Sequence, residues 1–461
     1  MYRYIRKPGL ALVLSAISAL GIFAGSALHT AGADSGQGPE PGSHTNVILI
    51  TISTLRADHL SCFGYNRRTT PNFDSFARTN ALFRNAFAAS GWMMPAHGSI
   101  FTSLYPTCHG ATHVDQVLAD NQDTLAEILH DNGYYCMAFC CNPRLDSVHG
   151  FAQGFDLYDD YSVSIMLDSM GFETGETVDI NKRRTNDFIN DAAIRWLRNN
   201  AHQPFFMFVH YYDNHWDYLP PPPYDKLYDP NYGGPINGAE IAREPLFSNP
   251  PPAADVQHII DLYDGEVKQT DNDLGEMLQF LRQQRLLDNS IVIVAGDHGE
   301  QFYEHGHTSH QGLFEELIHV PLAVSVPGPK AEGKNIDSLV SQVDILPTIL
   351  DYLGIPVSGA CQGKSLKPLI EGRADTVNDV IFAEYTAAAV PDCYVVRSAR
   401  YKYYEGVGEG FAYDLLKDPN EQKKILPVDF PQELGELQQN MQKFRQRCQS
   451  PATPGQEATR E

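Results

Sequence analysis

The chain has 461 residues, a hydrophobic content of 43% and a formal net charge of −23. This length and composition are those of a globular protein with one large domain, or with a large domain and a small one. The acidic balance disfavours nucleic acid and anionic membranes as partners, and the sequence contains no stripe of basic residues. We therefore expect no nucleic-acid partner.

The first 33 residues have the pattern of a secretory signal peptide. A basic start from Tyr2 to Lys7 precedes an apolar stretch from Leu10 to Leu28, and Ala31-Gly32-Ala33 offers a cleavage point. We predict cleavage there, a Gly/Pro/Ser linker over residues 34–45, and export to the periplasm or the extracellular space. The alternative is an uncleaved membrane anchor, because the apolar stretch is just long enough to span a bilayer.

Strands alternate with helices over most of the chain. Residues 46–52 form a continuous apolar, β-branched run, which is typical of a strand buried in a parallel sheet. Further strands are expected at residues 134–140, 205–211 and 291–295, and helices at residues 71–80, 95–104, 124–130, 186–199, 255–284 and 343–353. This order predicts an α/β fold with a large, mostly parallel mixed sheet that is flanked by helices.

The character of the sequence changes in its C-terminal part. Short strand-like pieces occur at residues 394–397 and 402–404, and a helix is expected at residues 431–445. We predict a main α/β domain over residues 46–356, a small C-terminal antiparallel α+β subdomain over residues 357–449 and a disordered tail over residues 450–461.

Disulfides are chemically possible in an exported chain with eight cysteines. Cys361 and Cys393, both towards the C-terminus, are a candidate bridge, although the sequence does not determine pairing. Cys140 and Cys141 are adjacent in an expected strand, and we do not expect them to bond to each other. The spacing of Cys and His residues matches no zinc motif.

Polar clusters follow several of the expected strands at their carboxyl ends, where open α/β sheets form their sites. Ser53 to Asp58 follow the first strand, and Tyr212 to His215 and Gly296 to Glu300 follow two later ones. Another polar run, from Glu304 to His310, comes just afterwards. Neighbouring Asp and His side chains suit a divalent cation. The alternative is a set of loops with capping Asp and solvated His residues.

These residues resemble the sulfatases of the alkaline phosphatase superfamily, over about residues 46–426. The similar blocks occur in the expected order, at Asn46–Tyr65, Thr70–Asp74, Gly150–Tyr158, Asp264–Val267, Gly296–Glu300, Val343–Thr348 and Arg400–Tyr403. The resemblance implies an alkaline phosphatase-like fold with a smaller antiparallel sheet behind the large one. It also implies sulfate ester hydrolysis with a calcium-like ion and a Cys or Ser that is oxidised to formylglycine.

Met93 stands where the resemblance places the nucleophile. It lies in the segment Ser90–Ile100, which is similar to the family pattern C/S-x-P-x-R, with Pro95 retained and His97 in place of the Arg. A thioether has no proton to lose and cannot attack a sulfate ester as an alkoxide does. We therefore expect no formylglycine, and we interpret Met93 as a packing residue.

The resemblance places metal ligands at Ser53, Asp297 and His298. Asp297 matches a metal-binding Asp, and His298 takes the place of an Asn or His ligand. Ser53 stands where the first metal-binding Asp is expected, and serine is a weak neutral ligand, so a hard cation would lose a carboxylate. We expect a divalent cation, calcium by resemblance, whose binding is weakened or lost.

His97, His215 and His310 are the candidate catalytic residues that the resemblance leaves. His215 matches a substrate-facing His, and His310 falls where a Lys or His contacts the anion. The Lys and His that follow the next strand in active arylsulfatases fall near Cys141 and Pro143, so that pair is missing.

Three hypotheses follow from this mixed set of residues. The first is a sulfatase-fold protein with a degraded active site, weak or inactive as a sulfatase, which binds a small anionic ester or another sulfated or phosphorylated ligand. The second is an active, divergent metal-dependent hydrolase of sulfate or phosphate esters, with candidate cation ligands at Asp213, His215, Asp297, His298 and His310. The third is a non-catalytic interaction protein. A membrane is expected as a partner only if the N-terminal segment stays uncleaved.

Overall fold

The computed structural model describes residues 44–160, 184–239, 241, 246, 249–328, 333–357, 359–387, 390–406, 408 and 410–449. The predicted signal peptide, nearly all of the predicted linker and the predicted tail lie outside these residues. None of the described helices combines the length and the apolar character that crossing a membrane requires.

An eight-stranded sheet carries the fold, with the strand order β10-β2-β9-β6-β1-β5-β3-β4. Its strands are β1 (Asn46–Ile52), β2 (Ala81–Phe87), β3 (Tyr135–Cys140), β4 (Leu157–Asp159), β5 (Phe205–Tyr211), β6 (Ser290–Gly296), β9 (His319–Ser325) and β10 (Lys334–Ser341). Neighbouring strands are parallel, except that β9 runs antiparallel to β2 and β6. The predicted mostly parallel mixed sheet is confirmed.

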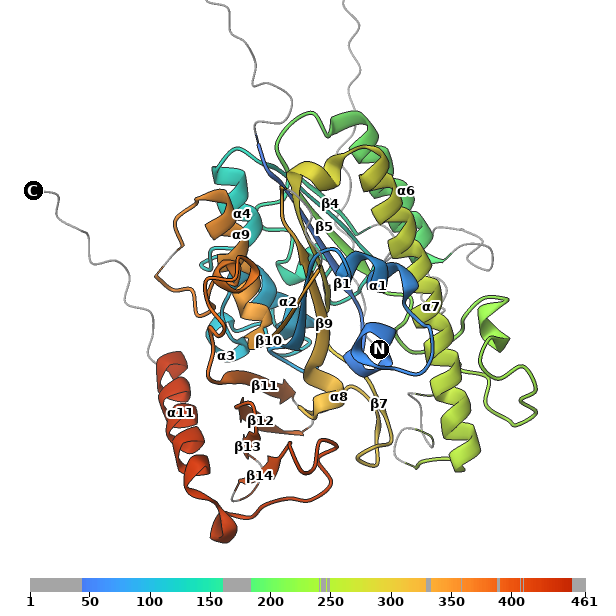
Figure 1. Ribbon diagram of the computed structural model, residues 1–461, viewed down its shortest axis with the longest axis vertical. Helices are drawn as coiled ribbons and strands as arrows, with labels where there is room; N and C mark the ends of the chain where they lie inside the picture. Colours follow the sequence, from blue (N-terminus) through green and yellow to red (C-terminus); the bar gives the residue numbers. More distant parts are fainter. Residues whose placement is uncertain are drawn as a thin grey trace, which may run out of the picture. The chain divides into compact units, whose positions relative to one another are not determined.

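Both faces of this sheet are buried, which explains the apolar run of β1. Val47 and Leu49 pack into one core, whereas Ile48, Ile50 and Ile52 pack into the other. The first core lies under α2 (Met93–Thr102), α4 (Leu125–Asp131) and α9 (Ile345–Leu353). The second lies under α1 (Pro71–Ala77), α6 (Thr185–Asn200) and α7 (Ala253–Gln283), and Figure 1 shows the two helical layers on opposite sides of the sheet.

A four-stranded antiparallel sheet follows in the C-terminal part, with the order β11-β12-β13-β14. Its strands are β11 (Ile381–Ala387), β12 (Val390–Arg397), β13 (Tyr401–Glu405) and β14 (Phe411–Asp414), and α11 (Gln432–Gln449) lies along it (Figure 1). The helix contributes Leu434, Leu437, Met441 and Phe444 to the core that it shares with the sheet. The predicted antiparallel subdomain is therefore present, and its boundary at residues 356 and 357 stays a prediction.

Shorter elements complete the described chain. These are the helices α3 (Pro106–His109), α8 (Glu315–Ile318) and α10 (Lys367–Ile370), and a small antiparallel pair of β7 (Gln301–Phe302) with β8 (Thr308–Ser309). Helix α2 begins at Met93, not at Pro95 as expected from the proline. A proline in the first turn of a helix is tolerated because the N–H that it lacks has no partner inside the helix.

The candidate bridge between Cys361 and Cys393 is not formed, because both side chains are free thiols. Sγ of Cys361 instead lies 2.9 Å from Oγ of Ser103. Cys393 is buried on β12, and its burial raises the pKa of the thiol to about 12. Cys108, in contrast, is disulfide-bonded.

Candidate active site

The predicted site residues lie at one edge of the main sheet, beyond the carboxyl ends of β6, β1 and β5. These strands are parallel neighbours and end in register. Ser53 and Thr54 follow β1, His215 follows β5, and Asp297 and His298 follow β6. Side chains that are far apart in the sequence therefore meet at this edge.

Asp297 is the carboxylate around which these residues gather, and it is completely buried. Its Oδ1 atom accepts hydrogen bonds from the backbone N–H groups of Thr54 (2.9 Å) and His298 (2.6 Å). Its Oδ2 atom has no hydrogen-bond partner among the described residues, and it lies 3.7 Å from Nε2 of His298 and 4.0 Å from Nδ1 of His97. Burial raises the pKa of Asp297 to about 7.

His97 belongs to a chain of hydrogen bonds that links α2, β1 and β5. Its Nδ1 atom lies 2.9 Å from the carbonyl oxygen of Met93, which can only accept, so Nδ1 carries the proton. Nε2 then accepts from the Thr51 hydroxyl (3.1 Å), and the Thr51 oxygen accepts from Nδ1 of His210 (2.8 Å). Nε2 of His210 in turn accepts from the Asn142 amide (3.2 Å). Every ring nitrogen of these two histidines thus has a partner.

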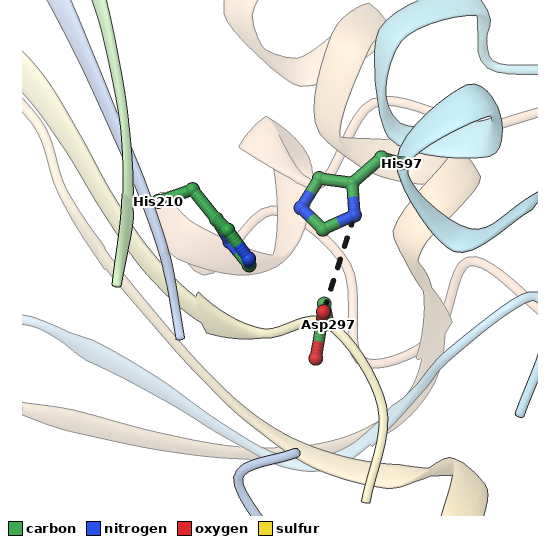
Figure 2. Close-up of side chains that lie close together, drawn as sticks. All are labelled: His97, His210 and Asp297. Carbon is green, nitrogen blue, oxygen red and sulfur yellow. Dashed lines mark ion pairs between the residues drawn. The ribbon is translucent and has the colours of Figure 1, made fainter. Parts of the chain in front are cut away.

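Burial holds both histidines of this chain in the neutral form. It lowers the pKa of His97 and lowers that of His210 well below its ordinary value. Figure 2 shows His97, His210 and Asp297 pointing towards one another, and their ligand atoms all lie within 4.8 Å. A cation at this point would have to break hydrogen bonds that the histidines already make. The trio therefore fits a metal ion less well than Asp297 and His298 do.

A second group of side chains lies beside Asp297 and consists of the buried His215, His298 and Glu300 and the largely buried His310. The His310 ring lies 5.1 Å from the His215 ring and 4.8 Å from the His298 ring, between centroids, and its Nδ1 atom is 3.3 Å from Oε1 of Glu300. Burial lowers the pKa to about 3 for His215 and His298 and to about 4 for His310. It raises the pKa of Glu300 to about 7. The three imidazoles are therefore neutral at neutral pH.

Several polar atoms of the site are buried without a hydrogen-bond partner. In the described part of the chain these are Oγ of Ser53, Oδ1 of Asn214, Nε2 of His215, Oδ2 of Asp297, Nε2 of His298 and Oε2 of Glu300. Buried polar atoms are usually paired with protein, water or an ion. Nε2 of His298 and Oδ2 of Asp297 are strong metal-ligand atoms, and Oγ of Ser53 is a weak one. These atoms fit a divalent cation, with fewer carboxylates than a calcium site commonly has.

Met93 packs into the protein core at the edge of this site. It is the first residue of α2, and it is only 5% exposed. Its thioether belongs to the same apolar core as Met94 and Phe101. The hydroxyl of Ser99, less than two turns further along the helix, lies 3.3 Å from Nε2 of His109. Ser99 is thus engaged with His109 and does not replace a nucleophile at position 93.

Asp213 lies apart from these groups. Its carboxylate accepts from Nε of Arg184 (3.2 Å) and from the backbone N–H of Asn186 (3.2 Å) at the start of α6. An acidic side chain in this position caps the helix and stabilises its N-terminal end. We therefore interpret Asp213 as a capping residue. The remaining candidate cation ligands are His215, Asp297, His298 and His310.

Thr51, Asn142 and His210 belong to the arrangement although no motif predicts them. His210 leaves a signal in the sequence, because a titratable ring within the apolar strand β5 needs a buried partner. Thr51 leaves none, because threonine is common in strands for its β-branched shape. Asn142 lies between the positions where a Lys and a His are expected by resemblance, and it supplies a neutral amide there.

Residues 45–355 match the protein family described as sulfatase. The chain belongs to the sulfatase family. Residues 303–447 also match the family described as N-sulphoglucosamine sulphohydrolase, C-terminal. The family assignment and the alkaline phosphatase-like fold expected from the sequence are therefore confirmed.

Curated sulfatases are similar to this chain over most of their length. The chain is 24% identical over 466 residues to an N-acetylglucosamine-6-O-sulfatase of Bacteroides thetaiotaomicron, a match that covers 84% of this chain and 83% of the relative. It is 25% identical over 432 residues to an arylsulfatase of Clostridium perfringens, a match that covers 83% of this chain and 90% of the relative. The solved phosphonate monoester hydrolase of Agrobacterium radiobacter has a TM-score of 0.74 at 23% identity, over 88% of this chain and 96% of that one. This last similarity establishes the fold.

Proposed function

We propose that this sulfatase-family protein keeps a ligand-binding pocket but no longer hydrolyses sulfate esters by the nucleophilic route of the family. The observation that carries the proposal is Met93, which occupies the nucleophile position by resemblance and packs into the core. Its thioether can neither be oxidised to an aldehyde hydrate as Cys or Ser can, nor lose a proton to attack sulfur.

The proposed cofactor is a divalent cation, calcium by resemblance to the family, held by Asp297 and His298 with Ser53 as a weak third ligand. The unpaired buried atoms Oδ2 of Asp297 and Nε2 of His298 support this assignment. When bound, the cation would supply positive charge for an oxyanion of the ligand. Because Ser53 brings no carboxylate, we propose that binding is weaker than in a site with two aspartates.

The proposed ligand is a small anionic ester of the sulfated or phosphorylated class. Sulfatases among the relatives support this class, and one of them is named for a sulfated amino sugar. We propose that His215 and His310 face the ligand, and that His97 acts on it only indirectly because both of its ring nitrogens are hydrogen-bonded. We also propose export, with residues 1–33 as the signal peptide.

An active, divergent metal-dependent hydrolase of sulfate or phosphate esters is the second candidate function. The observation in its favour is that Nε2 of His215 and Oε2 of Glu300 are buried and unpaired within the described residues. Either group is able to exchange a proton with a reacting water molecule. The third candidate, a non-catalytic interaction protein, needs neither metal nor turnover.

Turnover and metal content together separate these functions. The purified chain and its Asp297→Ala variant are assayed with 4-nitrophenyl sulfate and bis(4-nitrophenyl) phosphate, and their bound metal is measured. Bound divalent metal without turnover supports the proposal, provided that Asp297→Ala lowers the metal content by one equivalent per chain. Turnover that Asp297→Ala abolishes would overturn it in favour of the hydrolase. Neither metal nor turnover would favour the interaction protein.

A further inference from the structure

A separate group of metal-ligand side chains lies on α7, outside the site described above. His258 and Asp261 are one turn apart on this helix and therefore share a face. Asp229 reaches them from the loop that follows a short 3-10 helix at Tyr224–Lys226. The ligand atoms of the three side chains all lie within 4.8 Å of one another, and His258 and Asp261 are buried.

The His258 ring is held in a fixed orientation. The Tyr232 ring stacks on it with 3.5 Å between centroids and an interplanar angle of 6°. The Tyr232 hydroxyl donates to Oδ1 of Asp255 (2.7 Å), one turn earlier on α7. The stack restricts rotation of the His258 ring, so its two nitrogens keep their directions.

Nδ1 of His258 is buried and has no hydrogen-bond partner among the described residues. It faces Oδ2 of Asp229 at 3.5 Å, and the His258 side chain is only 8% exposed. A buried imidazole nitrogen that faces carboxylates needs either a shared proton or a cation. Two ligand atoms that each lie about 2.1 Å from a tetrahedral Zn²⁺ are about 3.4 Å apart, close to the separation between Nδ1 of His258 and Oδ2 of Asp229.

The charge of the surroundings also matches a divalent cation. The carboxylates here are those of Asp229, Asp261 and Asp264. Arg67 supplies one positive charge through contacts of 2.6 Å to Asp261 and 2.7 Å to Asp264, and Nδ1 of His59 lies 2.7 Å from Asp264. Carboxylates therefore outnumber the permanently charged basic side chains by two. Unbalanced carboxylates in a largely buried place are unfavourable, and one divalent cation balances this charge.

We propose that Asp229, His258 and Asp261 bind a divalent cation of the Zn²⁺ class and fasten the loop around Asp229 to α7. One imidazole nitrogen with two carboxylate oxygens favours an ion of borderline softness over Ca²⁺, which takes six to eight oxygen ligands. Binding at this site does not require a cation at Asp297, so this proposal can be correct or wrong whatever the outcome for the proposed function.

Zinc titration of the full-length chain tests the proposal. The parent protein carries Asp297→Asn, so that a cation at that residue does not contribute, and it is freed of metal before Zn²⁺ is added in a calorimeter. We expect one Zn²⁺ per chain. His258→Gln and Asp229→Asn, each added to the parent, are expected to abolish this binding or to weaken it by at least about tenfold.

His130→Gln is the matched control. His130 also lies beside a carboxylate, with Nε2 at 3.5 Å from Oδ1 of Asp156, but its side chain is 52% exposed and belongs to no ligand trio in the described chain. This control is expected to keep the full equivalent of Zn²⁺. A parent that binds no Zn²⁺, or His258→Gln and Asp229→Asn variants that bind it as the control does, would overturn the proposal. If His258→Gln does not fold, Asp229→Asn decides, because the Asp229 side chain is 32% exposed and on a loop.

Discussion

Replacing Thr51 by valine tests the hydrogen-bond chain through His97 and His210. Valine keeps the shape of threonine but removes the hydroxyl that donates to Nε2 of His97 and accepts from Nδ1 of His210. All three side chains are completely buried. Water therefore has no direct access to replace the lost partner, and both imidazoles are left with an unpaired nitrogen.

The structure sets the size of the expected effect. Leaving a buried donor or acceptor unpaired costs about 1–3 kcal/mol. Thr51→Val leaves one acceptor, Nε2 of His97, and one donor, Nδ1 of His210, without a partner. We therefore expect it to lower the free energy of unfolding by about 2–6 kcal/mol. Thr51→Ser keeps the hydroxyl and removes only a methyl group, which costs about 1 kcal/mol. Native proteins are stable by about 5–15 kcal/mol, so the difference is large enough to measure.

Urea unfolding followed by tryptophan fluorescence provides the assay. Trp92 caps the N-terminus of α2, the helix that carries His97, and so reports on this region. We expect the midpoint of Thr51→Ser to lie near that of the unmodified chain and the midpoint of Thr51→Val to lie well below both, with equal slopes. If the two variants were equally stable, the hydrogen-bond chain would contribute nothing, and His97 and His210 would be available to a cation after all.

Three further predictions concern the metal site, the nucleophile and the pH dependence of stability. Ser53→Asp is expected to tighten Ca²⁺ binding by at least about tenfold in calorimetric titration, because it adds a carboxylate to the one on Asp297; unchanged affinity would contradict the proposed ligand set. Met93→Cys alone is expected to give no turnover of 4-nitrophenyl sulfate, since Ser53 still leaves the cation short of a carboxylate, and strong activity would refute that reasoning. Burial, together with the nearby negative charge of Asp213, raises the pKa of Asp273 to about 8. The folded protein therefore binds the proton of Asp273 more tightly than the unfolded chain does. The stability that this group contributes below about pH 4 is lost as the pH rises towards 8, by up to about 1.4 kcal/mol per pH unit. Asp273→Asn is expected to flatten this slope in urea midpoints measured across that range, and an unchanged slope would show that another group causes it.

The parallel part of the sheet was predictable because its strands are buried on both faces. β1, β5 and β6 consist of nearly uninterrupted apolar residues, which is the pattern that such burial requires. β2 and β9 were not predictable in this way. Arg84 and Asn85 interrupt the apolar pattern of β2, and Pro321 lies inside β9.

The pairing of β2 with β9 explains both irregularities. The register shifts between Phe83 and Ala86, so that Arg84 and Asn85 lie at a bulge opposite Pro321. A bulge leaves a ladder position without a hydrogen bond, and this is a position that tolerates a proline. The irregular residues of the two strands thus match each other, but only the paired strands reveal the match.

The candidate site likewise contains residues that the sequence predicts and contacts that it does not. Asp297 and His298 were predictable because they follow an apolar strand, and a strand end is where such sites form. The hydrogen bonds that join Thr51 to His97 and to His210 span 46 and 159 residues of sequence. No local pattern records partners at such separations, so the neutral state of His97 and its lack of a free nitrogen emerge only from the fold.

Electrostatics make the proposed cation and the proposed anion depend on each other. His215, His298 and His310 offer no positive charge at neutral pH, because burial holds the pKa of each at about 3 or 4. Arg56 donates from Nη1 to the carbonyl oxygen of Glu300 (3.0 Å), yet its charge is engaged by two carboxylates, those of Asp58 and Glu304.

Neutral imidazoles and carboxyl groups give an anionic ester no favourable charge of their own. A cation beside Asp297 would supply that charge, and under the proposed ligand set Ser53, which brings no carboxylate, would weaken its binding at the same point. Once the cation binds weakly, an alkoxide or aldehyde hydrate at position 93 would face an ester that is neither bound nor stabilised as it reacts. If Ser53 is the proposed weak ligand, it would remove most of what a nucleophile at position 93 could contribute, so the two proposed losses would be physically coupled. Under the proposed function, this coupling would explain how a methionine at position 93 is compatible with the buried polar group that Asp297 and His298 form.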